Sequence, residues 1–198
     1  MRKTLMYYDS NADSFIQGTR TVDFSKIQNL FLSKLEKDSL ILDFGCGSGR
    51  DTRYFLDKGY SVEALDGSAE MCKAASQYTG IEVKQMLFQE LNVVEEYDGI
   101  WACSSILHLT VVELKDVMKK ISLALKDNGI AYVSFKYGTF EGERNGRYFT
   151  DMTETTFAKV LEAVNSFDIE EEWITGDVRP GRGDERWLNV ILRKQNKG

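Results

Sequence analysis

Cysteine and proline are scarce in this sequence, and long hydrophobic runs are missing. The three cysteines, Cys46, Cys72 and Cys103, are an odd number without metal-ligand spacing, so we expect reduced thiols, a cytoplasmic location and no metal site. Pro180 is the only proline, so no proline-rich linker divides the chain, and residues 1–198 are predicted to form one domain. No apolar segment follows the N-terminal basic pair or approaches the roughly 18 residues of a membrane span, so we expect neither a signal peptide nor a membrane partner.

Basic residues are in the minority. Lysine and arginine number 25 against 31 aspartates and glutamates, which gives a formal net charge of −6. A protein that covers a polynucleotide normally presents a basic face. We therefore expect no nucleic-acid partner, although this balance leaves room for a local basic pocket.

The chain does contain a regular alternation of short apolar strands and helices. Capping residues mark several helix starts, among them Ser68 and the Thr110–Glu113 capping box, and Asp127-Asn128-Gly129 is a turn signal. Strands are predicted at residues 39–44, 60–65, 81–87, 97–104 and 130–136, and helices within 9–35, at 50–58, 68–78 and 110–126, and from 151 onward. This alternation is typical of a parallel sheet with crossover helices on both faces.

Two further strands, at residues 167–174 and 186–193, close the predicted sheet. The segment between them, Thr175 to Glu185, is rich in glycine and aspartate, whereas a parallel crossover usually carries a helix. The last strand should therefore run antiparallel. The fold class predicted is α/β, with a seven-stranded, mostly parallel sheet and an antiparallel last strand.

A glycine-rich motif, Asp43-Phe44-Gly45-Cys46-Gly47-Ser48-Gly49, follows the first strand and leads into a helix. Glycines let the backbone turn sharply and bring bare amides close to a ligand, so such a loop is typical of nucleotide-type sites. The dinucleotide fingerprint requires a third glycine where this chain has Arg50. The acid at Asp43 instead suits the cationic amino-acid end of a ligand.

A second acid, Asp66, ends the second strand in Leu65-Asp66-Gly67-Ser68. Its two oxygens are placed to accept both hydroxyls of a ribose. The alternative is a solvated turn aspartate. The glycine-rich motif at the preceding strand favours the ribose interpretation.

These motifs together resemble one known family over nearly the whole chain. Residues 42–49 resemble the first motif of the class I S-adenosylmethionine-dependent methyltransferases, residues 65–71 the second and residues 97–101 the fourth-strand motif. The antiparallel seventh strand is typical of the same Rossmann-like fold. Within the superfamily, the chain looks most like the small bacterial methyltransferases of the tellurite-resistance type.

The resemblance implies S-adenosylmethionine as the cofactor. Asp43 would contact its methionyl amino group and Asp66 its ribose, and Arg50 is either a ligand of its carboxylate or a solvated arginine at the helix start. In the strand-three stretch, Gln89 is the first candidate for the adenine amine and Glu90 the second. The cofactor residues implied are Asp43, Gly45, Cys46, Gly47, Arg50, Asp66, Gly67, Met71, Phe88, Gln89, Glu90 and Cys103.

Acceptor residues are less constrained by the sequence. His108, the only histidine, follows strand four and is either a general base or a structural residue. Tyr8 precedes the predicted N-terminal helix, and residues 1–37 are expected to form a helical lid. Arg147 and Arg179 lie in two long charged loops on the same rim and are the other acceptor candidates.

The function predicted is methyl transfer from S-adenosylmethionine to a small-molecule acceptor. Such a transfer depends mainly on positioning the nucleophile, so the sequence requires no fixed catalytic side chain. Two alternatives stay open: a non-catalytic cofactor-binding module, and a methyltransferase acting on RNA or protein. The sequence does not indicate an oligomeric state.

Overall fold

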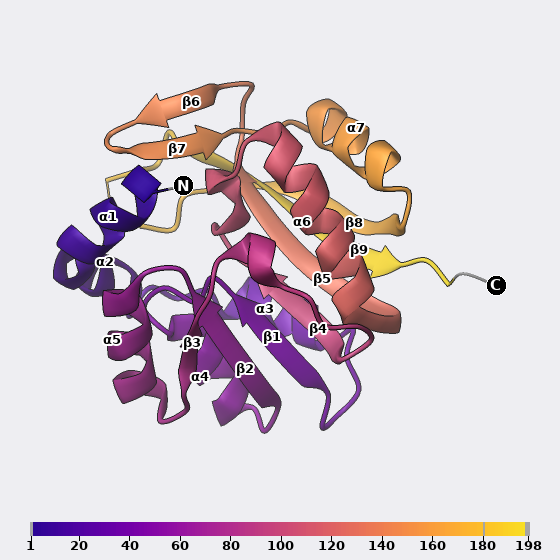
Figure 1. Ribbon diagram of the computed structural model, residues 1–198, viewed down its shortest axis with the longest axis horizontal. Helices are drawn as coiled ribbons and strands as arrows, with labels where there is room; N and C mark the ends of the chain where they lie inside the picture. The colour runs from indigo at the N-terminus through magenta and orange to yellow at the C-terminus, as the bar shows by residue number, and fades with distance from the viewer. Residues whose placement is uncertain (1, 180, 197–198) are drawn as a thin grey trace.

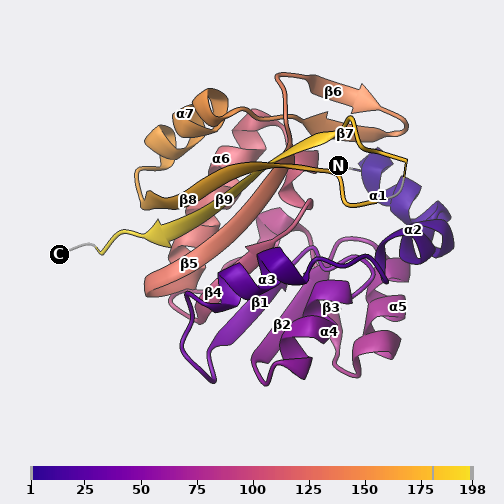
Figure 2. The same ribbon diagram turned by 180° about the vertical axis from the view of Figure 1, so that it is seen from behind.

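A computed structural model describes residues 2–179 and 181–196, and it has the predicted α/β architecture. One central sheet lies between two layers of helices (Figures 1 and 2). The strands of the main sheet are β1 (Leu40–Phe44), β2 (Ser61–Asp66), β3 (Val83–Gln85), β4 (Tyr97–Ala102), β5 (Leu125–Lys136), β8 (Phe167–Gly176) and β9 (Arg186–Lys194). The α-helices are α1 (Arg2–Ser10), α2 (Ala12–Thr19), α3 (Ser25–Leu32), α4 (Arg50–Asp57), α5 (Ala69–Thr79), α6 (Val111–Ala124) and α7 (Glu154–Val164).

The sheet has seven strands in the order β3-β2-β1-β4-β5-β9-β8. The first five pair in parallel, whereas β9 runs antiparallel to both of its neighbours, β5 and β8. The prediction of an antiparallel last strand is therefore confirmed. Because β1 and β4 lie at the centre of the parallel half, the loops after them meet at one edge of the sheet.

Both faces of the central strands β1, β4 and β5 are buried, which explains why these strands are nearly continuous apolar runs. Leu42 and Phe44 point into one core with α6 and α7, while Ile41 and Trp101 point into the other with α3 and α4. Helix α5 covers the β2 and β3 edge on the α3–α4 side. No helix in the described part of the chain is long and apolar enough to cross a membrane.

The predicted caps form as expected at two helices. The Ser68 hydroxyl accepts the amide N–H of Met71 at the start of α5, and Thr110 and Glu113 form a reciprocal capping box at α6. Helix α7 begins at Glu154 and is capped by Thr153, whose side chain accepts the Thr156 amide N–H, so the cap lies two residues beyond the predicted Asp151.

Three segments differ from the sequence-based expectation. Tyr7 and Tyr8 lie inside α1, not before the N-terminal helix. Strand β3 is limited to Val83–Gln85. Strand β5 begins at Leu125, and the predicted turn at 127–129 is an irregularity within it, where Asn128 has φ 61° and the pairing register with β4 shifts.

The fourth difference is a hairpin in the segment expected to be a loop, formed by β6 (Glu141–Arg144) and β7 (Arg147–Thr150). Its turn is Asn145-Gly146, with φ 52° and 76°, the left-handed pair that a tight hairpin turn requires. The hairpin stands beside α1 in both views (Figures 1 and 2). The Lys3 ammonium contacts the Glu143 carboxylate at 2.9 Å, so the N-terminal helix and the hairpin close over the same sheet edge.

Candidate functional site

A cavity of about 680 Å³ opens at the carboxyl ends of the parallel strands. Its walls come from the segments that follow β1, β2, β3 and β4, from the end of β5, and from α1, α2, β7 and β9. Volumes of this size are typical of pockets that hold small organic ligands. The fold therefore gathers most of the sequence-predicted residues at one place.

The glycine-rich loop forms the floor of one half of this cavity. Gly45 has φ 90° and Gly47 has φ 53°, a region that other residues avoid. A Cβ on Gly45 would lie 2.5 Å from the Cβ of Ser105, so only glycine lets the loop pass under the β4 edge. Cys46 lines the cavity between these two glycines.

Asp66 stands beside this loop and lines the cavity. One carboxylate oxygen accepts the amide N–H of Gly47 at 2.9 Å and the other accepts that of Ser68 at 2.9 Å. Burial raises the pKa of this carboxyl, and its backbone amide donors oppose the rise. Each oxygen keeps a free lone pair, so the fixed carboxylate can still accept hydroxyl groups from a ligand.

Asp43 lies beneath the loop and does not line the cavity. It is 2% exposed, and one of its carboxylate oxygens accepts the Thr52 hydroxyl at 2.5 Å. Burial, together with the negative charge of Asp51, raises the pKa of Asp43 well above its usual range. Asp43 therefore does not reach the cavity that most of the other predicted cofactor residues line.

Arg50 lines the cavity and is held in place by Asp51, a residue the sequence did not single out. Its guanidinium donates to both oxygens of Asp51 at 2.8 and 2.9 Å. Asp51 also accepts Gln28 Nε2 at 2.7 Å and the Trp101 indole N–H at 2.9 Å. This network joins α3, α4 and β4, so Arg50 is a fixed cation at the cavity wall, not a solvated one.

Apolar side chains form the wall between β2 and β3. Met71, Met86, Leu87 and Phe88 all line the cavity there. Gly67 lines it too, and the Leu5 side chain from α1 packs so closely that a Cβ on Gly67 would lie 2.7 Å from it. This wall offers flat apolar surface of the kind that a purine requires.

Gln89 and Glu90, the adenine candidates, do not line the cavity. The Gln89 amide points toward Glu113, 3.4 Å away, and its Oε1 atom is buried without a hydrogen-bond partner. Glu90 is exposed and accepts the Leu87 amide N–H at 2.8 Å, which caps the short 3₁₀ turn Phe88–Glu90. Their positions leave Phe88 as the only member of that triplet at the cavity.

Cys103 lines the middle of the cavity, where β4 ends. Burial, together with the charge of Asp51, raises the pKa of its thiol to about 12, so the sulfur is uncharged at neutral pH. The Ser104 amide that follows donates to the Ser134 hydroxyl at 2.8 Å. Among the residues that the structure describes, no group of three or more potential ligands is arranged for a metal ion.

His108 and Tyr8 form a hydrogen-bonded pair at the far side of the cavity. The Nδ1 atom lies 2.6 Å from the carbonyl oxygen of Tyr148, which can only accept, so this nitrogen carries the proton. Nε2 therefore accepts the Tyr8 hydroxyl at 2.8 Å. Burial lowers the pKa of His108 to about 4, which keeps the ring neutral. Arg147 Nη1 donates to the same hydroxyl at 3.4 Å.

Lys136 and Arg179 complete this side, each with a carboxylate partner. The Lys136 ammonium pairs with Glu185, and Arg179 donates to both oxygens of Asp177. Burial disfavours the Asp177 charge, but the hydrogen bonds from Arg179 outweigh it and lower the pKa of Asp177 to about 2. The ring of Trp187 on β9 lies beside them.

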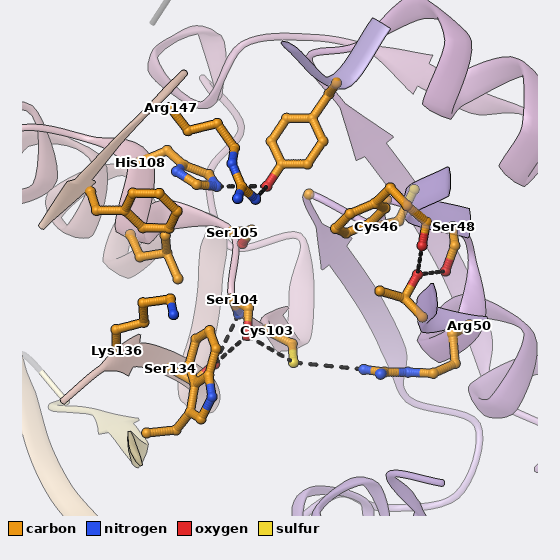
Figure 3. A pocket seen from close by; sticks show the side chains of 18 of the residues that line it. Cys46, Ser48, Arg50, Cys103, Ser104, Ser105, His108, Ser134, Lys136 and Arg147 are labelled. Atoms are coloured by element: carbon orange, nitrogen blue, oxygen red, sulfur yellow. Dashed lines mark hydrogen bonds between the residues drawn. The ribbon is translucent and has the colours of Figure 1, made fainter. Parts of the chain in front are cut away.

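Figure 3 shows the two sides of the cavity facing one another. Cys46, Ser48 and Arg50 lie on one side, His108, Arg147 and Lys136 on the other, and the Cys103–Ser105 segment runs between them. The sequence analysis did not identify several lining residues of both sides. Those residues are Leu5, Phe15, Phe24, Asp51, Met86, Leu87, Lys136, Trp187 and Asn189.

Known proteins resemble this chain in sequence and in fold. A family model described as a methyltransferase domain matches residues 41–129. An uncharacterized methyltransferase of Staphylococcus carnosus is 27% identical over 124 residues, which are 62% of this chain and 59% of that relative. The chain therefore aligns with less than two thirds of that relative's length.

Two solved structures share the fold over most of both chains. The 1,6-didemethyltoxoflavin N1-methyltransferase of Burkholderia thailandensis, solved with 1,6-didemethyltoxoflavin and S-adenosylhomocysteine bound, is 20% identical at a TM-score of 0.81, covering 98% of this chain and 88% of that one. A TehB-like methyltransferase of Corynebacterium glutamicum is 18% identical at a TM-score of 0.71, covering 94% and 99%. At these identities the likeness concerns the fold.

The sheet order and the glycine-rich loop beside Asp66 give the chain the fold of the class I S-adenosylmethionine-dependent methyltransferase superfamily, and residues 41–129 match a methyltransferase-domain model. The fold expected from the sequence is confirmed, and the resemblance to this superfamily is supported. S-adenosylmethionine, the cofactor expected from the sequence, is the cofactor of this superfamily.

Proposed function

We propose that this protein transfers the methyl group of S-adenosylmethionine to a small-molecule acceptor. The observation that carries the proposal is Asp66, whose carboxylate is fixed by two backbone amides at the cavity wall, next to the left-handed glycines Gly45 and Gly47. A carboxylate in that position suits a ribose, and bare backbone beside it lets a nucleoside approach closely.

The residues present fit the cofactor. A side chain at Gly45 would collide with Ser105, so the loop keeps a bare backbone at the cavity floor. Met71, Met86, Leu87 and Phe88 supply an apolar wall for adenine, while Arg50 supplies a cation for the methionyl carboxylate. When bound, the cofactor supplies an electrophilic methyl group on a sulfonium.

The acceptor is expected on the opposite side of the cavity, across from Cys103. A second wall of polar and aromatic side chains faces the glycine-rich loop there, and His108 and Arg147 are seen on it in Figure 3. Tyr8 and Trp187 line the same cavity. A protein that only bound the cofactor would have no use for this second wall, which favours an enzyme. The wall comes from α1, the 3₁₀ turn Ile106–His108 after β4, β7 and β9, so the cavity is bounded on several sides and suits a small molecule.

The side chains act here by positioning. The Tyr8 hydroxyl donates to His108 Nε2 and accepts from Arg147 Nη1, and its remaining lone pair can accept a hydrogen bond from an acceptor hydroxyl or amine. The neutral His108 holds that orientation through its bond to Tyr148. Within the segment 1–37 that was expected to form a lid, α1 and α2 line the cavity and serve as its cover, whereas α3 packs into the core beneath the sheet. The free thiols of Cys46, Cys72 and Cys103 accord with a cytoplasmic location.

Calorimetry and a product assay test this proposal. S-adenosylmethionine and S-adenosylhomocysteine should bind with one site per chain, while NAD should not bind. S-adenosylhomocysteine should then accumulate with a panel of small acceptors but not with transfer RNA, duplex DNA or protein. Cofactor binding without turnover on any substrate would refute the enzyme proposal in favour of a non-catalytic cofactor-binding module. Methylation of RNA, DNA or protein would refute the proposal of a small-molecule acceptor.

A further inference from the structure

Arg147 stands out among the cations of the cavity because no carboxylate neutralises it. The cationic side chains that line the cavity are Arg50, Lys136, Arg144, Arg147, Arg179 and Arg182. All the others form an ion pair with an aspartate or a glutamate. Within residues 2–179 and 181–196, Arg147 forms none, although it comes from the same hairpin as Arg144.

The surroundings of Arg147 are aromatic and supply few acceptors. Its guanidinium carbon lies 4.4 Å from the centre of the Tyr7 ring and 5.1 Å from that of Phe149. The hydroxyl of Tyr8 is its one hydrogen-bond acceptor among the described residues, at 3.4 Å, and its Nε atom is buried with no partner at all. A partly buried charge with unused donors is costly, so the site is incomplete without a negatively charged ligand.

The position of Arg147 links that ligand to the acceptor. Its guanidinium extends toward the interior of the cavity beside His108, on the side opposite Cys46 and Arg50 (Figure 3). His108 and Tyr8 beside it are neutral hydrogen-bonding groups, and Lys136 is already paired with Glu185. An anion in this half of the cavity therefore has Arg147 as its free charged partner.

We propose that the methyl acceptor carries a carboxylate and that Arg147 binds it. This inference rests on the proposed function. The planar guanidinium presents paired N–H groups that match the two oxygens of a carboxylate, and the rings of Tyr7 and Phe149 hold its plane in position. The rings of Phe149, Tyr8 and Trp187, which line the cavity, give apolar surface to the body of an acceptor, so the favoured class is a small, flat organic acid.

The test uses benzoate as the probe and benzamide as its uncharged match. Both are titrated into protein saturated with S-adenosylhomocysteine and labelled with ¹⁵N at arginine. The buried Nε–H of Arg147 gives the reporting signal, which is assigned by its loss in Arg147→Gln. Inorganic phosphate is a third probe that separates a carboxylate site from a general anion site.

Benzoate should shift the Arg147 signal saturably, and benzamide and phosphate should bind at least tenfold more weakly. Arg147→Gln should weaken benzoate binding by about 10- to 100-fold, the loss expected for a charged hydrogen-bonded partner, and Arg147→Lys should fall between. Arg53→Gln removes a positive charge from the exposed Arg53–Asp57 pair outside the cavity and should leave benzoate affinity unchanged.

Equal binding of benzoate and benzamide, tighter binding of phosphate, or full benzoate affinity in Arg147→Gln would overturn the inference. Binding of S-adenosylhomocysteine is measured in every variant and should match the wild type, because Arg147 lies on the other side of the cavity. Failure of the wild type to bind S-adenosylhomocysteine would refute the proposed function itself. The two failures are therefore distinguishable.

Discussion

Replacing Asp66 by alanine should weaken binding of S-adenosylhomocysteine without unfolding the chain. The carboxylate is proposed to accept the ribose hydroxyls, and hydrogen bonds to a charged group contribute about 1.5–3 kcal/mol each. Since the two bonds share one group and are not fully additive, we expect a loss of about 2–4 kcal/mol, or roughly 30- to 1000-fold in Kd. Asp66→Asn retains one carbonyl oxygen and should lose less.

The structure also predicts a stability cost for Asp66→Ala. The carboxylate accepts the amides of Gly47 and Ser68, each at 2.9 Å, and alanine leaves both to water. The side chain is only half-buried, so we expect about 1–2 kcal/mol, which lowers Tm by roughly 2–8 °C for a domain of this size. Asp57→Ala is the matched control, because Asp57 pairs with Arg53 on the exposed side of α4.

Calorimetry with S-adenosylhomocysteine and thermal unfolding are measured on the same preparations of wild type, both Asp66 variants and Asp57→Ala. Wild-type affinity in Asp66→Ala would refute the ribose assignment. A loss of affinity accompanied by a fall in Tm of more than about 15 °C, far beyond the two lost amide bonds, would make Asp66 a structural residue. Asp57→Ala should change neither quantity by more than a few tenths of a kcal/mol.

Three other substitutions follow from the same geometry. Gly45→Ala places a Cβ 2.5 Å from that of Ser105 at φ 90°, so thermal unfolding should show a loss of about 2 kcal/mol or more in unfolding free energy. Gly80→Ala, at φ 80° with open space around it, is the control and should cost only about 1 kcal/mol. Equal losses in the two variants would contradict the steric argument. Asp51→Ala leaves the half-buried Arg50 and the buried donors of Gln28 and Trp101 without their acceptor. It should lower the free energy of unfolding in urea by about 3–5 kcal/mol, and a loss below about 1 kcal/mol would contradict this reasoning. Burial lowers the pKa of His108 to about 4 in the folded chain, so the unfolded chain takes up the proton first as pH falls. The stability contributed by the neutral ring is complete above about pH 6.5, and about 3 kcal/mol of it is lost on acidification to about pH 4. His108→Gln should therefore flatten the dependence of the urea unfolding free energy on pH between these values. If the slope of that dependence is the same as in the wild type, the buried neutral ring is ruled out.

The sheet could be predicted from the sequence because local signals agreed with one another. Capping residues such as Ser68 and Thr110 correctly indicated where two helices start. The glycine- and aspartate-rich composition of residues 175–185 correctly predicted that β9 runs antiparallel. The β6–β7 hairpin was missed although Asn145-Gly146 is a strong turn signal. Its flanking residues do not alternate clearly between polar and apolar, so a rule based on periodicity finds no strands there.

The cofactor side of the site was more predictable than the acceptor side. Backbone positions such as Gly45 and Gly47 follow directly from the loop, since a positive φ and a close approach require glycine. Side-chain direction does not follow from the chain alone. Asp43 accepts a hydrogen bond from Thr52, and the Gln89 side chain donates to Glu113. Both are tertiary contacts that no local sequence pattern encodes. Lys136 and Trp187 meet only because β5 pairs with β9.

The place of β9 within the sheet has a consequence for synthesis on the ribosome. Strand β8 leaves the ribosome before β9, yet β9 lies between β5 and β8 and, among the strands that the structure describes, is the only one paired with β8. The parallel half, with the glycine-rich loop and Asp66, can assemble as soon as β5 has emerged. Strand β8 must wait without a hydrogen-bonded neighbour, as an open edge, until residues 186–194 are made. The cofactor side of the cavity is thus built early, and its acceptor wall, which includes Trp187, is finished last.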